Sequence, residues 1–531
     1  MSHPLHDSTG RTRGGAALPC LLLACTLAAC GGGGGGGTTA VSGWSQQAYV
    51  KAANAEASDS FGTSAAISGD TLVVGAVGED SNQTTITNGA TASVDNSASD
   101  AGAVYVYLRS GGVWSQQAYL KAANAEANDN FGYSVAISGD TLVVGATNED
   151  SSQTTITNGT TASSDNSTGN SGAVYVYLRS GGVWSQQAYL KAPNAGVSDA
   201  FGNSVAISGD TIVVGAASED SNEITITNGS TASGDDSVNS SGAAYVFVRS
   251  GTTWSQQAYL KAPNARAGDE LGYRVAISGN TIVVGADGED SNQTTVTNGN
   301  TASSDNSASN AGAAYVFVRS GTTWSQQAYL KAANAEAGDN FGTSVAISGD
   351  TIVVGASQED SNQTTITNGS TASSDNSASN AGAAYVFVRS GTNWSQQAYL
   401  KAPNTGRDNN FGTSVAISSD SIVVGAMFES SRQTTITNGG TASSDTSGSG
   451  VGAAYVFVRS GTNWSQQAYL KAANAENADR FGNSAAISGT TVVVGAYQEA
   501  SSQTTITNGS SASSDNSASG AGAVYVFRFG S

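Results

Sequence analysis

"FGTSVAISGDTIVVGASQED" occupies residues 341–360, and close variants begin at residues 61, 131, 201, 271, 411 and 481. The same stretch therefore recurs seven times at a constant spacing of seventy residues. All seven tryptophans stand at one phase of this period: Trp44, Trp114, Trp184, Trp254, Trp324, Trp394 and Trp464. A fixed long period indicates a repeat architecture, in which each unit packs on its neighbours.

One period contains four segments rich in Val, Ile, Tyr, Phe and Trp, which we expect to be strands: 341–348, 351–356, 382–390 and 394–402. Gly349-Asp350 suits a two-residue type II′ turn, and a second short turn follows Ser390, so the strands form an antiparallel meander. The second and third strands are apolar on both faces and must be covered on both sides. Seven sheets that cover one another in this way make a β-propeller.

The two ends of the repeat region complement each other. The last period stops at residue 531 without a fourth strand, and residues 44–52 supply an additional one before the first period. If residues 44–52 pair with 523–527, no sheet edge stays open. A β-solenoid, the alternative, needs no such complementarity. We therefore predict an all-β, seven-bladed propeller over residues 44–531, with four-stranded blades and the N-terminal strand in the last blade.

The pattern "FGTSVAISGD…VVGA" resembles the FG-GAP repeat of integrin α subunits and many exported bacterial proteins. The resemblance implies that Phe-Gly begins the innermost strand and that its ring packs between blades. The corresponding residues are Phe61, Gly62, Phe131, Gly132, Phe201, Gly202, Leu271, Gly272, Phe341, Gly342, Phe411, Gly412, Phe481 and Gly482.

Calcium is the usual cofactor of the family that this repeat resembles. Its site is an Asp-x-Asp/Asn-x-Asp-Gly loop between the first two strands, because several oxygens must converge on one ion. Here that loop is reduced to two residues, as in Gly349-Asp350. We expect no required cofactor. We also expect no calcium site of the family type, so other loops are the only candidates for calcium binding.

The N-terminus carries targeting signals. Arg11 and Arg13 precede an apolar segment that ends in Leu27-Ala28-Ala29-Cys30, which resembles the lipobox of bacterial lipoproteins. The resemblance implies a signal peptide over 1–29, acylation of Cys30, and a polyglycine tether over 30–43. Gly31 favours the outer membrane by family analogy, so we expect a lipid-anchored protein of the bacterial cell envelope or surface. The alternative is an ordinary secretory signal with an incidental cysteine.

Composition excludes several kinds of chemistry. The net charge of −20 argues against nucleic acid as a partner. His3, His6, Cys20 and Cys25 all precede Cys30, so the expected mature chain has no histidine and no free thiol. Imidazole bases, cysteine nucleophiles and His- or Cys-ligated zinc are excluded. We expect no enzyme. A polysaccharide-acting enzyme that uses carboxylates is the alternative, but near-identical blades provide no unique converging pair.

The surplus length of each period lies between the second and third strands, as in 357–381, where Asn368-Gly369 favours a small hairpin. We expect seven acidic, polar loops on one rim. Paired carboxylates recur in five of them, and with nearby oxygens they are candidates for binding a ligand or a cation. The alternative, which we favour, is that they are solvated loop charges. The residues are Glu79, Asp80, Glu149, Asp150, Glu219, Asp220, Glu289, Asp290, Glu359 and Asp360.

Departures from the repeat are candidates for a unique site that contacts an anion or a sugar. Drift between duplicated blades is the alternative, and we favour it. They are Arg266, Leu271 and Arg274 in the fourth blade, Arg407, Met427, Phe428 and Arg432 in the sixth, and Arg480 and Tyr497 in the seventh.

Together these features predict a monomeric binding or adhesion module for a protein or glycan ligand at the cell surface, with membrane contact through the lipid anchor only. An inert structural component of the envelope is the further alternative.

Overall fold

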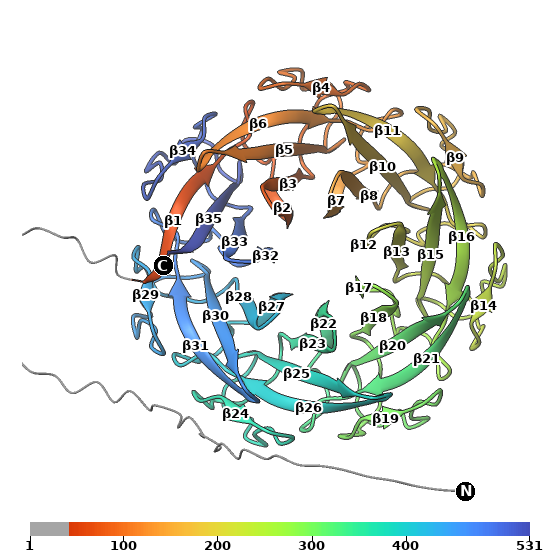
Figure 1. Cartoon of the computed structure of the whole chain (residues 1–531), viewed down its shortest axis with the longest axis vertical. Coiled ribbons are helices and arrows are strands. Elements are labelled where there is room, and N and C mark those ends of the chain that lie inside the picture. The colour runs from red at the N-terminus through yellow and green to blue at the C-terminus, as the bar shows by residue number, and fades with distance from the viewer. Residues whose placement is uncertain (1–41, 531) are drawn as a thin grey trace, which may run out of the picture. The chain divides into compact units, whose positions relative to one another are not determined.

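The computed structural model describes residues 42–530, which form one compact unit. The predicted signal peptide, Cys30 and most of the tether lie outside these residues. Seven five-stranded sheets are arranged in a ring, each with its innermost strand at the axis (Figure 1). The seven-bladed propeller predicted from the repeat is confirmed. Residues 42–530 contain no helix long and apolar enough to cross a membrane.

Each blade begins at the axis with a strand that follows or contains the Phe-Gly pair. These inner strands are β2 (Phe61–Ser68), β7 (Phe131–Ser138), β12 (Ser204–Ser208), β17 (Arg274–Ser278), β22 (Phe341–Ser348), β27 (Phe411–Ser418) and β32 (Ala485–Ser488). The second strands, fully buried in six of the seven blades, are β3 (Thr71–Ala76), β8 (Thr141–Ala146), β13 (Thr211–Ala216), β18 (Thr281–Ala286), β23 (Thr351–Ala356), β28 (Ser421–Ala426) and β33 (Thr491–Ala496).

The two following strands of each blade lie progressively farther from the axis. The third strands are β5 (Ala103–Ser110), β10 (Ala173–Ser180), β15 (Ala243–Ser250), β20 (Ala313–Ser320), β25 (Ala383–Ser390), β30 (Ala453–Ser460) and β35 (Ala523–Gly530). The fourth strands are β6 (Val113–Leu120), β11 (Val183–Leu190), β16 (Thr253–Leu260), β21 (Thr323–Leu330), β26 (Asn393–Leu400), β31 (Asn463–Leu470) and β1 (Gly43–Val50).

A short fifth strand, absent from the four-stranded prediction, completes each blade. The fifth strands are β4 (Thr87–Asn88), β9 (Thr157–Asn158), β14 (Thr227–Asn228), β19 (Thr297–Asn298), β24 (Thr367–Asn368), β29 (Thr437–Asn438) and β34 (Thr507–Asn508). The hairpin expected around Asn368-Gly369 is therefore wrong: Thr367 and Asn368 pair with Tyr399 and Ala398 of β26 instead. The long connections lie along the outer circumference of the ring (Figure 1).

The ring closes as the sequence predicts. Strand β1 pairs antiparallel with β35, from Gly43 opposite Gly530 to Val50 opposite Val524. The first strand of the described chain thus completes the last blade, in the order β32-β33-β35-β1-β34. No blade is left with an unpaired third strand.

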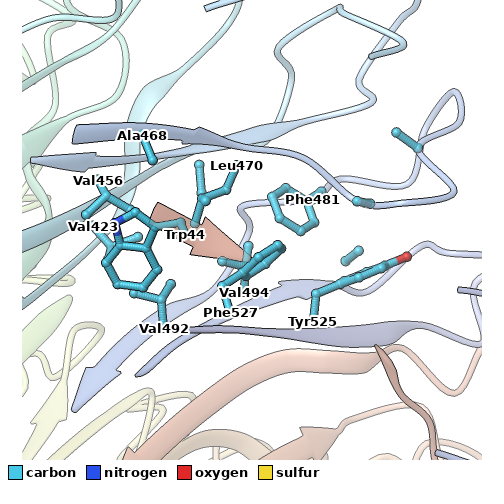
Figure 2. Packing of buried hydrophobic residues seen from close by; sticks show 14 of the residues in the cluster. Trp44, Val423, Val456, Ala468, Leu470, Phe481, Val492, Val494, Tyr525 and Phe527 are labelled. Atoms are coloured by element: carbon cyan, nitrogen blue, oxygen red, sulfur yellow. The ribbon is translucent and has the colours of Figure 1, made fainter. Parts of the chain in front are cut away.

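The hydrophobic core consists of seven clusters, each between two neighbouring blades. In the cluster that Figure 2 shows, Phe481, Phe527 and Trp44 of the last blade pack against Val423 and Leu470 of the sixth. The Phe-Gly phenylalanines are at most 1% exposed, and Leu271 takes the same place in the fourth blade. The packing role that the resemblance implied for this position is confirmed.

The glycine of the motif is required where neighbouring backbones approach. Gly62 has φ of +96°, and a Cβ there would lie 2.7 Å from the carbonyl oxygen of Ala523. A Cβ on Gly75, at the end of the second strand, would overlap the carbonyl oxygen of Gly132 in the next blade. At both positions a side chain would clash with the neighbouring backbone. At Gly62 the positive φ is a second reason for glycine.

Candidate functional site

The paired carboxylates predicted as candidate ligands separate into two structural roles. The glutamates are buried, each 1% exposed: Glu79, Glu149, Glu219, Glu289 and Glu359. Glu429 and Glu499, which lack the aspartate neighbour, are buried to the same extent. The expectation that these glutamates are solvated loop charges is wrong, because each lies at the root of its long connection beneath the polar surface.

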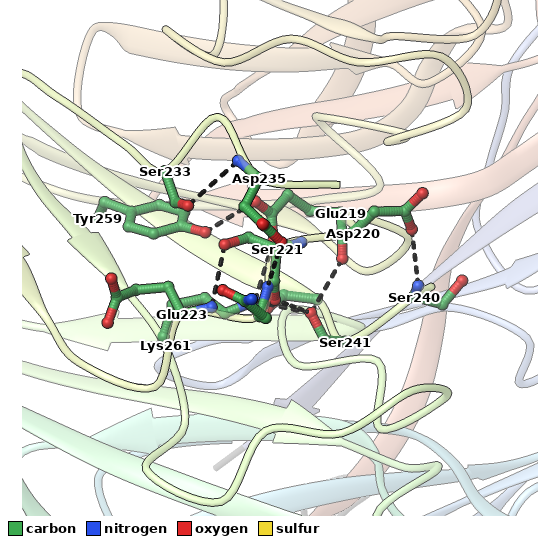
Figure 3. A network of polar contacts seen from close by, with 12 residues as sticks. Glu219, Asp220, Ser221, Glu223, Ser233, Asp235, Ser240, Ser241, Tyr259 and Lys261 are labelled. Carbon is green, nitrogen blue, oxygen red and sulfur yellow. Dashed lines mark hydrogen bonds and ion pairs between the residues drawn. The ribbon is translucent and has the colours of Figure 1, made fainter. Parts of the chain in front are cut away.

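Blade three shows the contacts of the glutamate (Figure 3). Glu219 Oε1 accepts hydrogen bonds from Tyr259 Oη at 2.7 Å and Asn194 Nδ2 at 3.0 Å, and Glu219 Oε2 lies 3.0 Å from Lys261 Nζ. The Lys261 ammonium also donates to the Ser241 hydroxyl and to the carbonyl oxygen of Gly242. A carboxylate with this set of partners is an anchor that joins three segments of the blade.

Burial shifts the pKa values of Lys261 and Tyr259, the two ionisable partners of Glu219. Desolvation lowers the pKa of Lys261, and the negative charge of Glu219 counteracts that shift. Desolvation also raises the pKa of Tyr259 far above its usual value, with Glu219 adding to the effect. The tyrosine therefore stays a neutral donor, and the glutamate is already paired with a cation.

The same ion pair occurs in every blade. Its members are Lys121–Glu79, Lys191–Glu149, Lys261–Glu219, Lys331–Glu289, Lys401–Glu359, Lys471–Glu429 and Lys51–Glu499. Sequence reasoning did not single out these lysines. A signal was present: Lys follows "AYL" or "AYV" in every period, and Glu persists in the two blades where the aspartate is lost.

The aspartates of the pairs cap a turn. Asp220 Oδ1 accepts the backbone N–H of Ser240 at 2.7 Å, and the equivalent bond recurs at Asp80, Asp150, Asp290 and Asp360. These aspartates are partly exposed. Residues 42–530 contain no cluster of three or more acidic, His or Cys side chains that would hold a metal ion. Cation or ligand binding at these aspartates stays a prediction.

A further row of carboxyl groups is buried at the connections between blades. Six aspartates, 2–5% exposed, each accept one backbone N–H three residues earlier: Asp59, Asp129, Asp199, Asp269, Asp339 and Asp479. Desolvation raises the pKa of Asp59 and Asp339 to about 8 and that of the other four to about 7. The sixth blade has Asn409 at this position.

The short turn where the family calcium loop would lie has another role. Asp350 accepts a hydrogen bond from Arg389 Nε at 2.8 Å, and the Arg389 guanidinium lies over the Trp394 ring at 5.2 Å. In the last blade both residues of this pair differ: Thr490 stands at the aspartate position and Phe529 at the arginine position. Phe529 packs edge-on against Trp44. The turn aspartate is thus half of a structural pair with arginine.

The departures from the repeat do not converge on one site, although Phe428 of the sixth blade and Arg480 of the seventh are in contact. Arg266, Arg407 and Arg432 are exposed, whereas Arg480 lies over the Phe428 ring at 4.0 Å. Met427 and Tyr497 are half-buried. Arg274 differs from all of these, because it lines a cavity on the propeller axis with residues from the other six inner strands.

The FG-GAP repeat model matches residues 44–107, 114–177, 184–247, 254–317, 324–387, 394–457 and 464–527. No curated protein matches the chain significantly.

Similar solved structures include the phage phi92 endosialidase, with 10% identity and a TM-score of 0.35 over 92% of this chain and 69% of that one. Another is an acylaminoacyl peptidase in complex with Z-Gly-Gly-Phe-chloromethyl ketone, with 10% identity and a TM-score of 0.32. That match covers 69% of this chain and 43% of the peptidase. The seven matched segments coincide with the seven blades, and the chain belongs to the FG-GAP repeat family, whose propeller is a binding or structural module.

Proposed function

We propose that this protein is a binding module of the bacterial cell envelope, lipid-anchored through Cys30, whose long connections offer a polar surface to a protein or glycan ligand. One observation carries the proposal: hydrogen bonds tie each connection to the blade or to itself at several points. In blade three, Glu219 accepts the N–H of Ser221 at the root of the connection, and Asp235 accepts the N–H of Asn222 across it. Asn228, in the fifth strand, donates to the carbonyl oxygen of Trp324 in the next blade. A surface fixed in this way loses little entropy on binding.

Because the long connection occurs seven times, several weak contacts with one polymeric ligand can act together. Seven copies of the same connection face the outer circumference, so a polymeric ligand meets several identical sites at once. Linked weak sites raise avidity by about 10²–10⁴ without any tight individual contact. The exposed groups are hydroxyls, amides and carboxylates, which suit hydrogen-bonding ligands, and the net charge of −20 disfavours polyanions.

The test is a binding screen of the mature chain against glycan and protein arrays, with and without calcium, followed by graded disruption. One exposed threonine at the same place in each connection is changed to glutamate in one, three or seven blades: Thr85, Thr155, Thr225, Thr295, Thr365, Thr435 and Thr505. We expect affinity for a polymeric ligand to fall stepwise with the number of altered blades.

The matched control places glutamates on the turns between the third and fourth strands, for example at the exposed Thr252. These variants carry the same added charge and should bind normally. An array without any bound ligand would contradict the proposal, as would equal losses in the two series. Turnover of a polysaccharide by the chain would favour the enzyme alternative instead.

A further inference from the structure

The propeller axis holds a cavity of about 240 Å³. All seven inner strands contribute to its wall, mainly through hydroxyl, amide and small aliphatic side chains. This volume is below the range of about 300–1,000 Å³ typical of drug-sized ligands. The space therefore suits a group as small as a single sugar ring.

Five of the six serines in this wall can only accept hydrogen bonds from a ligand. In five blades the hydroxyl donates to a glycine carbonyl of the next blade at 2.7–2.8 Å: Ser64, Ser134, Ser344, Ser414 and Ser484. Each hydroxyl has one hydrogen, so these five hydroxyls have only lone pairs left to offer a ligand. A ligand that satisfies this wall must bring its own donors.

Arg274 stands where the other six blades have serine, and it is the only charged residue in the wall of the cavity. Its Nη1 donates to the carbonyl oxygen of Tyr273 at 2.9 Å, and its guanidinium lies 4.6 Å from the centre of the Tyr273 ring. Among residues 42–530 it forms no ion pair, whereas five other arginines pair with the turn aspartates of their blades.

Asp287 of the same blade lies near Arg274 without forming an ion pair with it, and Glu270 lies near Asp287. Asp287 is 7% exposed, its Oδ1 has no hydrogen-bond partner among the described residues, and burial raises its pKa to about 7. Glu270 is half-buried, and burial also raises its pKa. Their presence disfavours a doubly charged anion near Arg274, but a single negative charge can still pair with the guanidinium.

We propose that the axial cavity binds a hydroxylated monocarboxylate of the sugar-acid class. Its carboxylate pairs with the free N–H groups of Arg274, which match a carboxylate with two parallel hydrogen bonds. Its hydroxyls donate to the serine oxygens of the opposite blades. Tyr133, which is 40% exposed and lines the same cavity, offers a ring face to the sugar. The site lies on the axis and does not depend on the outer connections.

The experiment measures binding of the mature chain by calorimetry to five small probes: D-glucuronate, methyl β-D-glucuronide, D-glucose, acetate and inorganic phosphate. We expect both uronates to bind and the other three to bind at least about tenfold weaker, because each lacks a carboxylate, the hydroxyls, or a single charge. Binding of free glucuronate alone would identify a free sugar acid as the ligand. Binding of both would extend the site to a glycan terminus.

The decisive variant is Arg274→Ser, which restores the residue of the other blades and should fold normally. We expect it to lose uronate affinity at least about tenfold, with an unchanged melting temperature. Arg432→Asn is the control: it removes one exposed arginine and restores the asparagine of the repeat, so it should bind as the parent does. Unchanged affinity in Arg274→Ser, equal affinity for glucose or acetate, or no uronate binding would overturn the proposal, whatever the outer connections bind.

Discussion

Asn438 and Trp44, 394 residues apart, exchange two hydrogen bonds. The Trp44 N–H donates to Asn438 Oδ1 at 2.7 Å, and Asn438 Nδ2 donates to the Trp44 carbonyl oxygen at 3.2 Å. The same exchange joins Asn228 to Trp324 within the continuous chain. The junction that closes the ring is thus built like the junctions between consecutive blades.

Asn438→Ala and Asn228→Ala should therefore lower the free energy of unfolding by similar amounts, about 1–3 kcal/mol, because each leaves a partly buried backbone N–H and C=O without partners. Chemical denaturation measures both. Thr85→Ala, on the exposed surface, is the control and should change little. A cost for Asn228→Ala with none for Asn438→Ala would show that the ring is open in solution.

Removal of one buried glutamate should strongly lower the free energy of unfolding. Glu219→Ala leaves the Lys261 ammonium, 1% exposed, without its carboxylate, and losses of about 3–5 kcal/mol are typical of broken buried pairs. Asp220→Ala, which removes only a turn cap, should cost about 1 kcal/mol. Denaturant midpoints compare the two.

Replacing both Glu219 and Lys261 tests whether the unpaired buried charge causes the loss of stability in Glu219→Ala. Glu219→Leu combined with Lys261→Met should be much less destabilising than Glu219→Ala alone, because no buried charge remains unpaired. If the double variant is as unstable as the single one, the hydrogen bonds from Tyr259 and Asn194, rather than the ion pair, account for the loss.

Stability should fall as the pH rises from about 4 to 8. The six buried aspartates have pKa values of about 7–8 in the folded chain against an ordinary value of 3.8, so the folded state binds more protons than the unfolded state in this range. Their contribution is fully present below about pH 4 and is lost as the pH passes their folded pKa. Denaturation midpoints at about pH 5.5 and 8 measure the difference.

Asp339→Asn should reduce this pH dependence. The amide stays neutral, as Asn409 does in the sixth blade, and its oxygen can still accept the N–H of Glu336. We expect the variant to be more stable than the parent at about pH 8, more stable by a smaller margin at about pH 5.5, and equal to it below about pH 4. A variant that is less stable at both would show that the carboxylate is charged in the folded state.

Gly145→Ala should weaken the contact between the second and third blades. The added Cβ would overlap the Gly202 carbonyl oxygen, and forced overpacking typically costs about 1–3 kcal/mol. Gly169→Ala is the matched control, since nothing lies within 4 Å of a Cβ there and its φ is not positive. Thermal denaturation of the two variants should separate them clearly.

The strands and their closure were predictable because packing between blades repeats with the period of seventy. Phe341 and Trp394 each recur at one phase, so position in the repeat alone places them in the core. The hairpin at Asn368 was not predictable from local turn preference. There the Asn368 side chain bonds to the backbone of Trp464 in the next blade, and this long-range contact overrides the turn.

The glutamates were misjudged for a related reason. A carboxylate in a polar connection is usually solvated, and only the partner lysine, which directly follows a strand distant in sequence, makes its burial favourable. Lys261 lies 42 residues after Glu219, beyond any local pattern. The role of Arg274 likewise depends on its position at the axis, where seven strands from the whole chain meet.

Because Gly43 pairs with Gly530, the ring of blades is continuous, and the fold does not depend on which blade contains the two ends of the described chain. A peptide link between these two ends and a cut in any of the seven connections from one blade to the next would preserve every pairing of the sheets. If the proposed lipid tether is present, such circular permutants would let it leave from any chosen blade and would turn a different part of the circumference toward the lipid surface.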